Sequence, residues 1–318
     1  MTRELLLLRH GKSDWSADVD DFHRPLKDRG KRGAQRIGVW LAQQKMVPDL
    51  IITSPAERAL VTAQKACKAM GYGDTGIQRD QRIYEAVVDD LLAVLGDCPQ
   101  DAGRVMLVGH NPGMEDLLVW LASATPAPDD GKLLPTATLA RLRLPVDWSA
   151  LVAGCAHLDA ITRPGSLPKK FPYPAPDGKE LRDRPAYYYT QSSVIPYRVR
   201  DGKAEILVIA SSKKHHLVVP KGIKDPGLSP RESAAKEALE EAGIEGEVAE
   251  TALGSYTCEK WGATCTVTVY PMKVTGLIAE EDWEESHRGR EWVSPERAAK
   301  ELKQRELAPL VNKLEAMF

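Results

Sequence analysis

The chain has 318 residues, of which 43% are hydrophobic and 28% are charged. These fractions are close to those of ordinary globular domains and exclude disorder along the whole chain. The length exceeds that of one typical hydrophobic core and predicts two domains. The net charge of −2 gives no general attraction to nucleic acid. No stretch approaches the roughly 20 apolar residues that span a bilayer, so neither nucleic acid nor a membrane is expected as a partner.

The cysteines are scattered and lack the short paired spacings of a zinc site; they are Cys67, Cys98, Cys155, Cys258 and Cys265. An odd, scattered set indicates reduced thiols, which predicts a cytoplasmic protein. The leucine run near the start is interrupted by Arg9 and has no cleavage-type segment after it. It is therefore not interpreted as a secretory signal.

The first predicted element is a buried strand over residues 5–8, a run of leucines that delivers Arg9 and His10 at its carboxyl end. A second apolar strand, over residues 104–108, ends at Gly109 and His110. Open α/β sheets bind ligands beyond the carboxyl ends of their strands. The two histidines are therefore expected to face one crevice.

Residues 50–53 predict another strand, which runs into a helix start at residues 54–58. Ser54 and Glu57 have the spacing of a capping box, and Arg58 falls in the first turn of the expected helix. Backbone amides at a helix start and an arginine side chain both attract an anion. An anion site is predicted there.

These pieces, together with residues 21–26 (DFHRPL) and the Arg29-Gly30 pair, resemble the histidine phosphatase superfamily and its small phosphohistidine phosphatases of the SixA type. The resemblance covers the first half of the chain. It implies an α/β domain with a three-layer arrangement, a sheet with helices on both faces. It also implies that His10 is the nucleophile that takes the phosphoryl group without a metal. Arg9, Arg58 and His110 would hold the phosphoryl oxygens.

Larger members of that superfamily use a carboxylate as general acid, and Glu85 lies at a plausible position. Small members often have no equivalent residue. Glu85 is therefore either a catalytic acid or a plain surface acid. Both interpretations stay open at the level of sequence.

A proline-rich segment over residues 163–186 cannot form a helix or a central strand. It predicts a semi-extended linker. The expected division is a first domain at residues 1–162, the linker, and a second domain at residues 187–318.

In the second domain, strand-like apolar segments alternate with turns and end in a helical region that starts at residue 295. The predicted strands cover residues 191–197, 204–211, 217–219, 252–260, 265–274 and 292–293. The expected architecture is a mixed sheet between helices.

Residues 222–244 contain the most informative helix. Ser229 and Glu232 form a capping-box pair, Pro230 suits the first helical position, and Gly243 suits a left-handed exit. Between these limits, three carboxylates share one side of the helix: Glu237, Glu240 and Glu241. Like charges three and four residues apart repel, so this face is expected to bind a cation.

The segment resembles the signature of the Nudix hydrolases, a family with an α/β/α sandwich. Leu228 stands where that signature usually has glutamate, and Lys236 where it has arginine. The resemblance implies that Glu237, Glu240 and Glu241 bind Mg²⁺ or Mn²⁺, with one of them as an alternative candidate for the base. A solvated acidic helix face is the competing interpretation.

Several basic residues precede or enter this helix loop and are candidates for gripping a chain of phosphates: Lys213, Lys214, His215, His216, Lys221 and Gly222 with its backbone. A solvated basic turn is the alternative for each side chain. Farther on, residues 281–286 and 290–292 resemble a stretch of the diphosphoinositol polyphosphate and dinucleoside polyphosphate hydrolases. Trp283 and Trp292 in these segments are either part of that likeness or packing aromatics.

The combined expectation is a bifunctional phosphohydrolase that acts on small phosphorylated molecules. The second domain would hydrolyse phosphoanhydrides with a divalent metal, and the first would remove a phosphoryl group through His10. The two domains are predicted to act in series or separately, and a phosphohistidine protein is a further candidate partner of the first. The alternative is a protein phosphohistidine phosphatase whose second domain is a non-catalytic ligand sensor. No oligomeric state is predicted.

Overall fold

The computed structural model describes residues 2–145, 147–176, 178–211 and 215–318. The chain divides into two units, Met1–Phe171 and Pro172–Phe318. The division falls inside the proline-rich segment. That segment contains a small sheet of β7 (Phe171–Pro172) and β8 (Leu181–Arg182).

The first unit is built on one sheet. Its strands, in spatial order, are β3 (Ile77–Arg79), β2 (Leu50–Thr53), β4 (Arg104–Gly109), β1 (Arg3–Arg9), β5 (Leu139–Leu144) and β6 (His157–Thr162). Neighbours from β3 to β1 are parallel, whereas β5 and β6 are antiparallel. The strands predicted at residues 5–8, 50–53 and 104–108 are confirmed as β1, β2 and β4.

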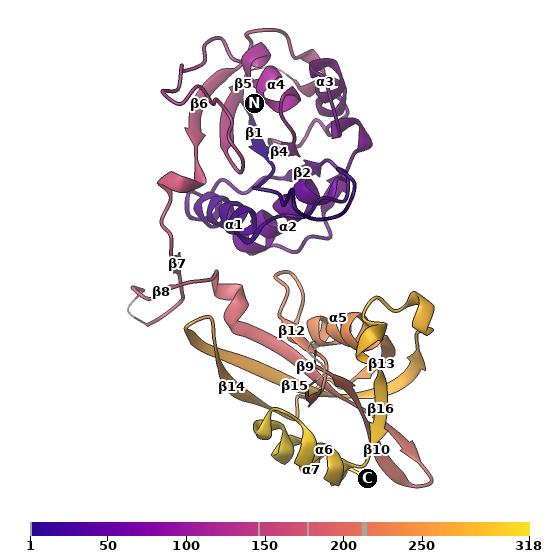
Figure 1. The fold of residues 1–318 in the computed structure, drawn as a ribbon. Coiled ribbons are helices and arrows are strands. Elements are labelled where there is room, and N and C mark those ends of the chain that lie inside the picture. The colour runs from indigo at the N-terminus through magenta and orange to yellow at the C-terminus, as the bar shows by residue number, and fades with distance from the viewer. Residues whose placement is uncertain (1, 146, 177, 212–214) are drawn as a thin grey trace. The chain divides into compact units, whose positions relative to one another are not determined.

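Helices cover both faces of this sheet, as Figure 1 shows: α1 (Asp28–Gln43) and α2 (Glu57–Met70) on one face, α3 (Val88–Gly96) and α4 (Gly113–Leu121) on the other. The leucines of β1 alternate between the two cores. Leu5 and Leu7 pack with α3 and α4, while Leu6 and Leu8 pack with α1 and α2. A strand buried on both faces requires a continuous apolar run. The expected three-layer α/β arrangement is confirmed.

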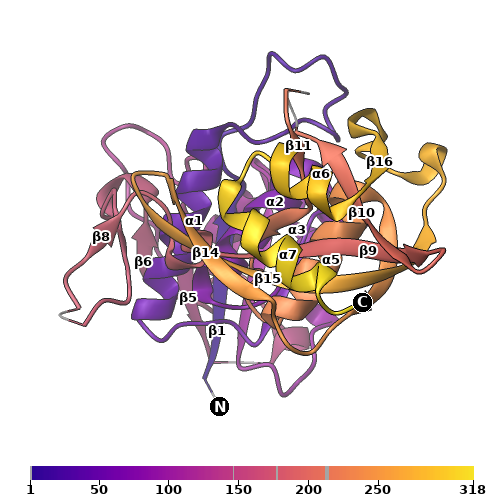
Figure 2. The ribbon, with the colours of Figure 1, turned by 90° about the horizontal axis from the view of Figure 1, so that it is seen from below.

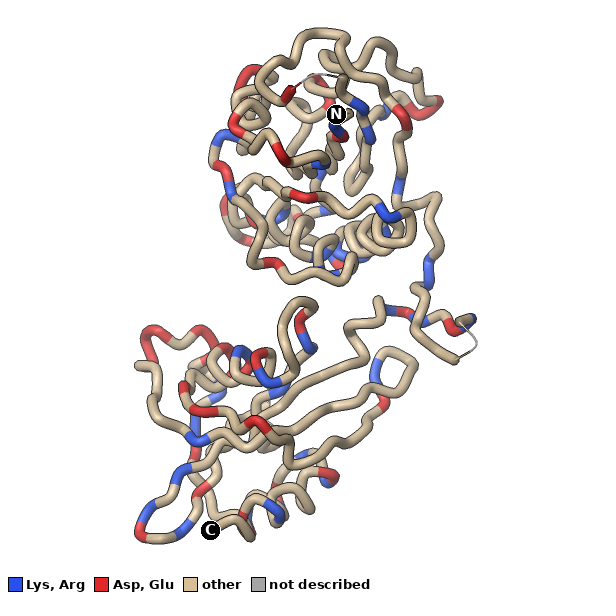
Figure 3. The backbone as a smooth tube through the Cα atoms, turned by 180° about the vertical axis from the view of Figure 1, so that it is seen from behind, with Lys and Arg blue, Asp and Glu red and all other residues tan. Residues whose placement is uncertain are grey.

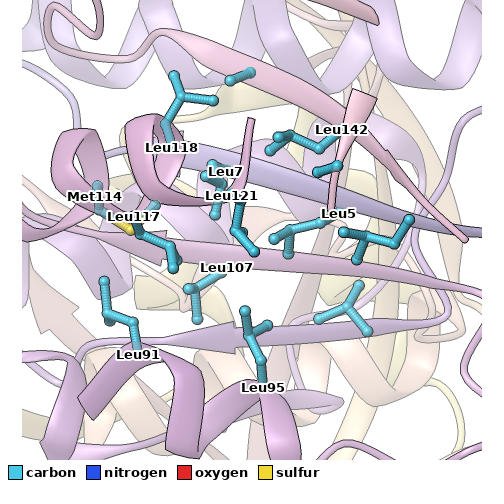
Figure 4. Packing of buried hydrophobic residues seen from close by; sticks show 14 of the residues in the cluster. Leu5, Leu7, Leu91, Leu95, Leu107, Met114, Leu117, Leu118, Leu121 and Leu142 are labelled. Carbon is cyan, nitrogen blue, oxygen red and sulfur yellow. The ribbon is translucent and has the colours of Figure 1, made fainter. Parts of the chain in front are cut away.

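Figure 4 shows the core on the α3 and α4 face. Leu91 and Leu95 reach toward the sheet from α3, and Leu117 and Leu121 from α4. Leu107 of β4 lies between them and is fully buried. Burial of one leucine stabilises a fold by about 1.5–3 kcal/mol, so this layer holds β1 and β4 rigidly side by side.

The second unit is a curved, mostly antiparallel sheet. Its strands are β9 (Thr190–Arg200), β10 (Lys203–Ala210), β11 (Leu217–Val218), β12 (Lys221–Ile223), β13 (Ile244–Val248), β14 (Gly254–Lys260), β15 (Ala263–Leu277) and β16 (Arg290–Val293). The main order is β11-β10-β9-β15-β13, with β12 on β9, β14 on β15 and β16 on β10. β9 and β15 are parallel neighbours.

Helices also cover both faces of this second sheet. α5 (Pro230–Ala242) packs its alanines on one face, and α6 (Pro295–Glu301) and α7 (Ala308–Glu315) pack on the other and contact each other (Figure 2). The expected α/β/α sandwich is confirmed. Short 3₁₀ turns complete the two units: Gln81–Ile83, Trp148–Ala150, Pro164–Ser166, Ala186–Tyr189, Glu280–Asp282, Ser286–Arg288 and Arg305–Leu307.

Helix limits were predicted well in one place and wrongly in another. In α5, Ser229 and Glu232 make both bonds of the capping box, Pro230 is the first residue and Gly243 exits at φ 57°. In α2, by contrast, the helix begins at Glu57 after Ala56, without a side-chain cap. The predicted capping box of Ser54 and Glu57 is wrong: the Ser54 hydroxyl accepts from the N–H of Ala56 at 3.3 Å, before the helix begins, and contacts His110.

Charges of both signs are interspersed along each unit (Figure 3). Within the described residues, no helix combines the length and the apolar composition that a membrane crossing requires. The cysteines of these residues are all free thiols.

Candidate functional sites

His10 lies at the carboxyl end of β1, beside the end of β4. Its backbone N–H donates to the carbonyl of Gly109 at 3.0 Å, so the two strands present His10 and His110 at one edge of the sheet. The ring centroids of the two histidines are 5.1 Å apart. The expectation that both face one crevice is met by this geometry.

The His10 ring is oriented by its own backbone. Nδ1 lies 2.7 Å from the Gly11 carbonyl oxygen, and since a carbonyl only accepts, Nδ1 carries the proton. Nε2 is then left with a free lone pair. Burial lowers the pKa of His10 to about 4; the bond to Gly11 opposes this shift, and the charges of Arg58 and Arg9 add to it. His10 is therefore neutral at physiological pH, as a nucleophile must be.

His110 is half-buried, and its Nε2 lies 2.9 Å from the hydroxyl oxygen of Ser54. Burial, followed by the electrostatic influence of the His10 ring and of the Arg58 charge, lowers the pKa of His110 to about 3. The residue is thus neutral as well. It can position a phosphoryl oxygen by a hydrogen bond rather than by charge.

Two buried arginines share one aspartate beside the histidines. Arg58 donates to the Asp21 carboxylate at 2.7 Å and also to its backbone carbonyl. Arg24 donates to the other oxygen of Asp21 at 2.5 Å and to the Ser13 hydroxyl at 2.7 Å. Burial alone would raise the pKa of Asp21, but these arginines and Tyr84 hold it below its usual value. Asp21 therefore stays charged and fixes both guanidinium groups.

Arg9 approaches from β1 and donates to the Leu134 carbonyl at 2.8 Å. Asn111, next to His110, donates to the Glu115 carboxylate at 2.7 Å. Several buried polar atoms around the histidines have no hydrogen-bond partner among the described residues: Arg9 Nε, Arg24 Nε, Arg58 Nε, His110 Nδ1 and Asn111 Oδ1. Unpaired buried groups are costly, so a polar ligand would stabilise this region.

These side chains surround a cavity of about 560 Å³. It is lined by Arg9, His10, Lys12, Ser13, Trp15, Asp21, Arg24, Arg58, Glu85, Ala86, Val87, His110, Asn111, Pro112, Gly113 and Thr136. The predicted residues Arg9, His10, Arg58, Glu85 and His110 are thus brought together. Glu85 is exposed on the wall with a left-handed φ of 55°. Its position is compatible with an acid for a leaving group.

The sequence indicated no part in the His10 site for the Asp21, Arg24 or Ser54 side chains. Asp21 and Arg24 belong to the quoted motif at residues 21–26, and that motif was the available signal for them. Ser54 was misread as a helix cap. Its contact with His110 spans 56 positions, which local pattern does not reveal.

In the second unit, α5 presents Glu237 and Glu241 toward β12, whereas the Glu240 side chain is exposed, 3.9 Å from Lys236. The Glu237 carboxyl lies directly against Gly222, and any Cβ at that position would overlap it. Burial raises the pKa of Glu237 to about 8, with the charges of Glu241 and Glu240 adding to the shift. Glycine is required in β12 because the carboxyl occupies the space of a side chain.

Glu241 is held from two sides. One oxygen accepts from the backbone N–H of Lys221 at 2.9 Å, and the other lies 3.0 Å from the guanidinium of Arg288. Arg288 is buried and also contacts Glu285 at 2.7 Å. No sequence signal indicated Arg288. It comes from a 3₁₀ turn that lies 47 positions after Glu241.

The loop before α5 is held in spite of the two departures from the family signature. Lys236, in the place of arginine, donates to Asp225 at 2.5 Å and lies 3.9 Å from Glu240. The N–H of Asp225 donates to Ser233 at 3.1 Å, and the N–H of Leu228 donates to the Asp225 carbonyl. Asp225 thus anchors the loop beside Leu228.

The basic residues predicted to bind phosphate lie in three different parts of the chain. Lys213 and Lys214 lie outside the described residues. His215 and His216 are exposed in the turn between β10 and β11. Lys221 is half-buried in β12 next to Glu241, with its Nζ 3.5 Å from the Gln191 side chain.

Trp283 and Trp292 both pack. Trp283 is 4% exposed, donates to the Glu240 carbonyl at 3.2 Å and covers Gly243. Trp292 is partly buried against the α5 core, with Arg198 over its ring at 4.1 Å. Trp283 therefore supports the end of α5 that carries Glu240 and Glu241.

Within the parts of the chain that the structure describes, no set of three or more His, Cys, Asp or Glu side chains is gathered closely enough to hold a metal ion. The chemistry of the donors nevertheless fits a divalent cation. After burial, the nearby carboxylates of Glu241, Glu240 and Asp225 raise the pKa of Glu237, and a cation would relieve that repulsion.

Comparison with known proteins agrees with both halves. A family model of the histidine phosphatase superfamily (branch 1) matches residues 5–91, and a model of the NUDIX domain matches residues 190–314. Nudix hydrolase 12, mitochondrial, from Arabidopsis thaliana is 31% identical over 142 residues, which are 37% of this chain and 69% of that protein.

The first unit has its own relatives. A 2,3-bisphosphoglycerate-dependent phosphoglycerate mutase of Arthrobacter sp. (strain FB24) is 38% identical over 93 residues, which are 27% of this chain. The chain spans only about a third of that mutase, 36% of its length. The structure of a phosphohistidine phosphatase SixA from Nakamurella multipartitia has a TM-score of 0.44 and 27% identity, and covers 52% of this chain and 97% of its own.

The two sites and folds define a two-domain protein of phosphate chemistry. The chain belongs to the Nudix hydrolase family through its second unit and carries a histidine phosphatase domain in its first. Both are families of hydrolytic enzymes, and their pairing supports a phosphohydrolase.

Proposed function

We propose that the protein is a bifunctional phosphohydrolase with two independent centres. The first removes a terminal phosphoryl group through His10, and the second hydrolyses phosphoanhydrides with a divalent metal. The observation that carries the proposal is the neutral His10, whose Nε2 is free in a cavity lined by three arginines and a second neutral histidine. Phosphoryl transfer needs mainly this positioning and positive charge.

In the first unit, Nε2 of His10 attacks phosphorus, and a nitrogen–phosphorus bond forms as the bond to the leaving group breaks. Arg9 and Arg58 neutralise the charge on the equatorial oxygens, and His110 donates a hydrogen bond to one of them. Glu85, which lines the same cavity, is the proposed acid for a poor leaving group. Water then hydrolyses the phosphohistidine and restores His10.

In the second unit, Glu237, Glu240 and Glu241 would hold Mg²⁺ or Mn²⁺, which would polarise the diphosphate and lower the pKa of water. Gly222 leaves room for Glu237, and the N–H of Lys221 together with Arg288 orients Glu241. The Lys221 side chain, and His215 and His216 in the nearby turn, are candidates to bind substrate phosphates. Dinucleoside polyphosphates, nucleotides and diphosphoinositol compounds are the proposed substrate classes.

The two centres are further proposed to act in series on small phosphorylated molecules. In that case the second unit cleaves the substrate first, and its phosphorylated product then reacts at His10 of the first unit. Free thiols fit the reducing conditions of the cytoplasm, where we place the protein.

One observation favours a second candidate, in which the Nudix unit is a ligand sensor. Glu241 is engaged by Arg288 and by the N–H of Lys221 rather than gathered with Glu237 and Glu240. In this case the first unit alone is catalytic and acts on a phosphohistidine protein. Binding of a pyrophosphate ligand without turnover in the presence of Mg²⁺ would distinguish the sensor from the enzyme.

The test compares the full chain with His10→Asn and Glu240→Gln on a dinucleoside tetraphosphate, with Mg²⁺ or with EDTA. Bifunctional hydrolysis predicts that Glu240→Gln blocks the first cut and that His10→Asn lets the intermediate phosphate product accumulate. Identical products from the full chain and His10→Asn would remove the case for coupling. No cleavage by the unmutated chain with Mg²⁺, together with retained ligand binding, would favour the sensor.

A further inference from the structure

The rim of the His10 cavity carries an exposed tryptophan. Trp15 lines the cavity together with His10, yet 73% of the residue is exposed to solvent. Single exposed hydrophobic side chains are common, but an aromatic ring at the edge of a polar cavity offers apolar surface to a ligand bound there. The mechanism at His10 does not use this ring.

One face of the Trp15 ring is covered by an arginine. The guanidinium of Arg24 lies 3.5 Å from the centre of the Trp15 ring, and Arg24 is itself buried and fixed by Ser13 and Asp21. The cation therefore holds the indole in place while most of its surface stays open. A pre-positioned flat ring is a stacking platform that loses little freedom when a ligand binds.

A further cation lies on the same wall. Lys12 lines the cavity, is exposed and forms no ion pair with any acid of the described residues. Arg9, Arg58 and the histidines serve one phosphoryl group, so Lys12 is available for a second. The cavity volume of about 560 Å³ also falls in the range of roughly 300–1,000 Å³ typical of clefts that enclose a whole organic ligand.

We propose that this rim is a subsite for a nucleoside diphosphate, with the nucleobase stacked on the open surface of Trp15, the inner phosphoryl group on Lys12 and the terminal phosphoryl group at His10. The inference rests on the proposed function of His10 and names its substrate class. A phosphohistidine has its ring bonded directly to the reacting phosphorus and offers no second phosphoryl group to Lys12. A nucleoside diphosphate would contact both Trp15, through its base, and Lys12, through its inner phosphoryl group.

The reaction balances without a further reagent. Nε2 of His10 forms a bond to the terminal phosphorus while the bond from phosphorus to the bridging oxygen breaks. That oxygen keeps the electron pair and leaves as part of the nucleoside monophosphate. Water then cleaves the phosphohistidine, which releases inorganic phosphate and restores His10.

The experiment measures KM and kcat of the full chain in EDTA with ADP and with acetyl phosphate, which has no ring. Trp15→Ala is compared with Trp15→Phe and with Val19→Ala, an exposed residue of the same loop that does not line the cavity. Stacking of one base on an aromatic side chain corresponds to roughly 5- to 150-fold in affinity. Trp15→Ala should raise KM for ADP by that factor with little change in kcat, and Trp15→Phe should restore most of it.

The loss should be confined to the substrate that carries a ring, and Val19→Ala should match the unmutated chain. An equal loss with acetyl phosphate, an unchanged KM for ADP, or an effect only on a phosphohistidine peptide would overturn the subsite. Turnover of acetyl phosphate that depends on His10 tests the proposed function separately. If that turnover is absent, calorimetric binding of ADP to His10→Asn with and without Trp15→Ala still decides the subsite.

Discussion

The two proposed phosphate sites are built from side chains of opposite charge. Around His10, the first unit gathers Arg9, Arg24 and Arg58 with a single shared aspartate, so the anion meets positive groups of the protein itself. The second unit carries carboxylates on α5, so we expect a phosphate to bind there together with a cation. The first site is predicted to be complete without a metal and the second to depend on one.

The burial of the key side chains has opposite consequences as well. Burial lowers the pKa of His10 and keeps its nucleophilic nitrogen unprotonated. Burial raises the pKa of Glu237 and keeps that carboxyl protonated in the absence of a cation. Desolvation thus favours the neutral form of both side chains. The neutral form of His10 suits the proposed nucleophile, whereas Glu237 would have to lose its proton to bind a cation.

The largest effect is expected at His10. His10→Asn removes the nucleophile but keeps a similar volume, and loss of a nucleophile lowers kcat by about 10⁴-fold or more. Phosphate release in EDTA measures this change. Metal-dependent cleavage by the second unit should be unaffected, and a matching fall in both activities would show that the comparison of two separate centres is wrong.

The next effect is expected at Glu237. Glu237→Gln keeps the shape of the buried side chain and removes a charge for the cation, so Mg²⁺-dependent hydrolysis should fall by about 10²–10³-fold. The exposed Glu245→Gln on β13 is the control. Because the carboxyl is protonated below about pH 8, Mg²⁺ binding at pH 7 should release a proton that calorimetry in two buffers detects. If the Glu237→Gln variant released as many protons on binding Mg²⁺ as the unmutated chain, the proton could not come from Glu237.

A smaller effect is expected at Gly222. The added methyl group of Gly222→Ala overlaps the Glu237 carboxyl, so either the helix or the side chain must shift. Overpacking costs typically 1–3 kcal/mol, which denaturant unfolding of the second unit can measure. Gly276→Ala, where the nearest atom lies at an ordinary 3.4 Å, is the matched control. Equal stability of the two variants would mean that Glu237 does not occupy this space.

The pH dependence gives the mildest test. His10 reacts only when neutral, so the acid limb of kcat/KM in the first unit should lie near pH 4 instead of 6.5. Histidines that stay neutral in the fold also destabilise it on acidification, since the unfolded chain binds protons between pH 6.5 and about 4 and the folded chain does not. A limb near pH 6.5 in phosphate-release assays would show that His10 is not desolvated.

Local pattern predicted the elements that carry the site residues. The leucine run of β1 and the capping box of α5 are signals between residues close together in the chain. The predictions of β1 and of the limits of α5 were therefore correct. Strands β5, β6 and β13 were not assigned, although β5 (LARLRL) alternates apolar and charged residues as a strand with one solvated face does. The predicted cap at Ser54 was wrong because the helix begins only at Glu57; the Ser54 hydroxyl accepts from the N–H of Ala56 and makes a long-range contact with His110.

The sequence by itself determined which chemical groups the protein brings to phosphate, because motif spacing places histidines at strand ends and glutamates on one helix face. Tertiary structure alone decided how those groups are held: Asp21 between two arginines, Ser54 against His110, and Arg288 on Glu241. Arg24 is only three positions from Asp21, but the Arg58–Asp21, His110–Ser54 and Arg288–Glu241 contacts join residues that are 37 to 56 positions apart. Side chains so distant in the chain meet only when the sheets and helices have packed, and burial then sets the protonation of His10 and Glu237.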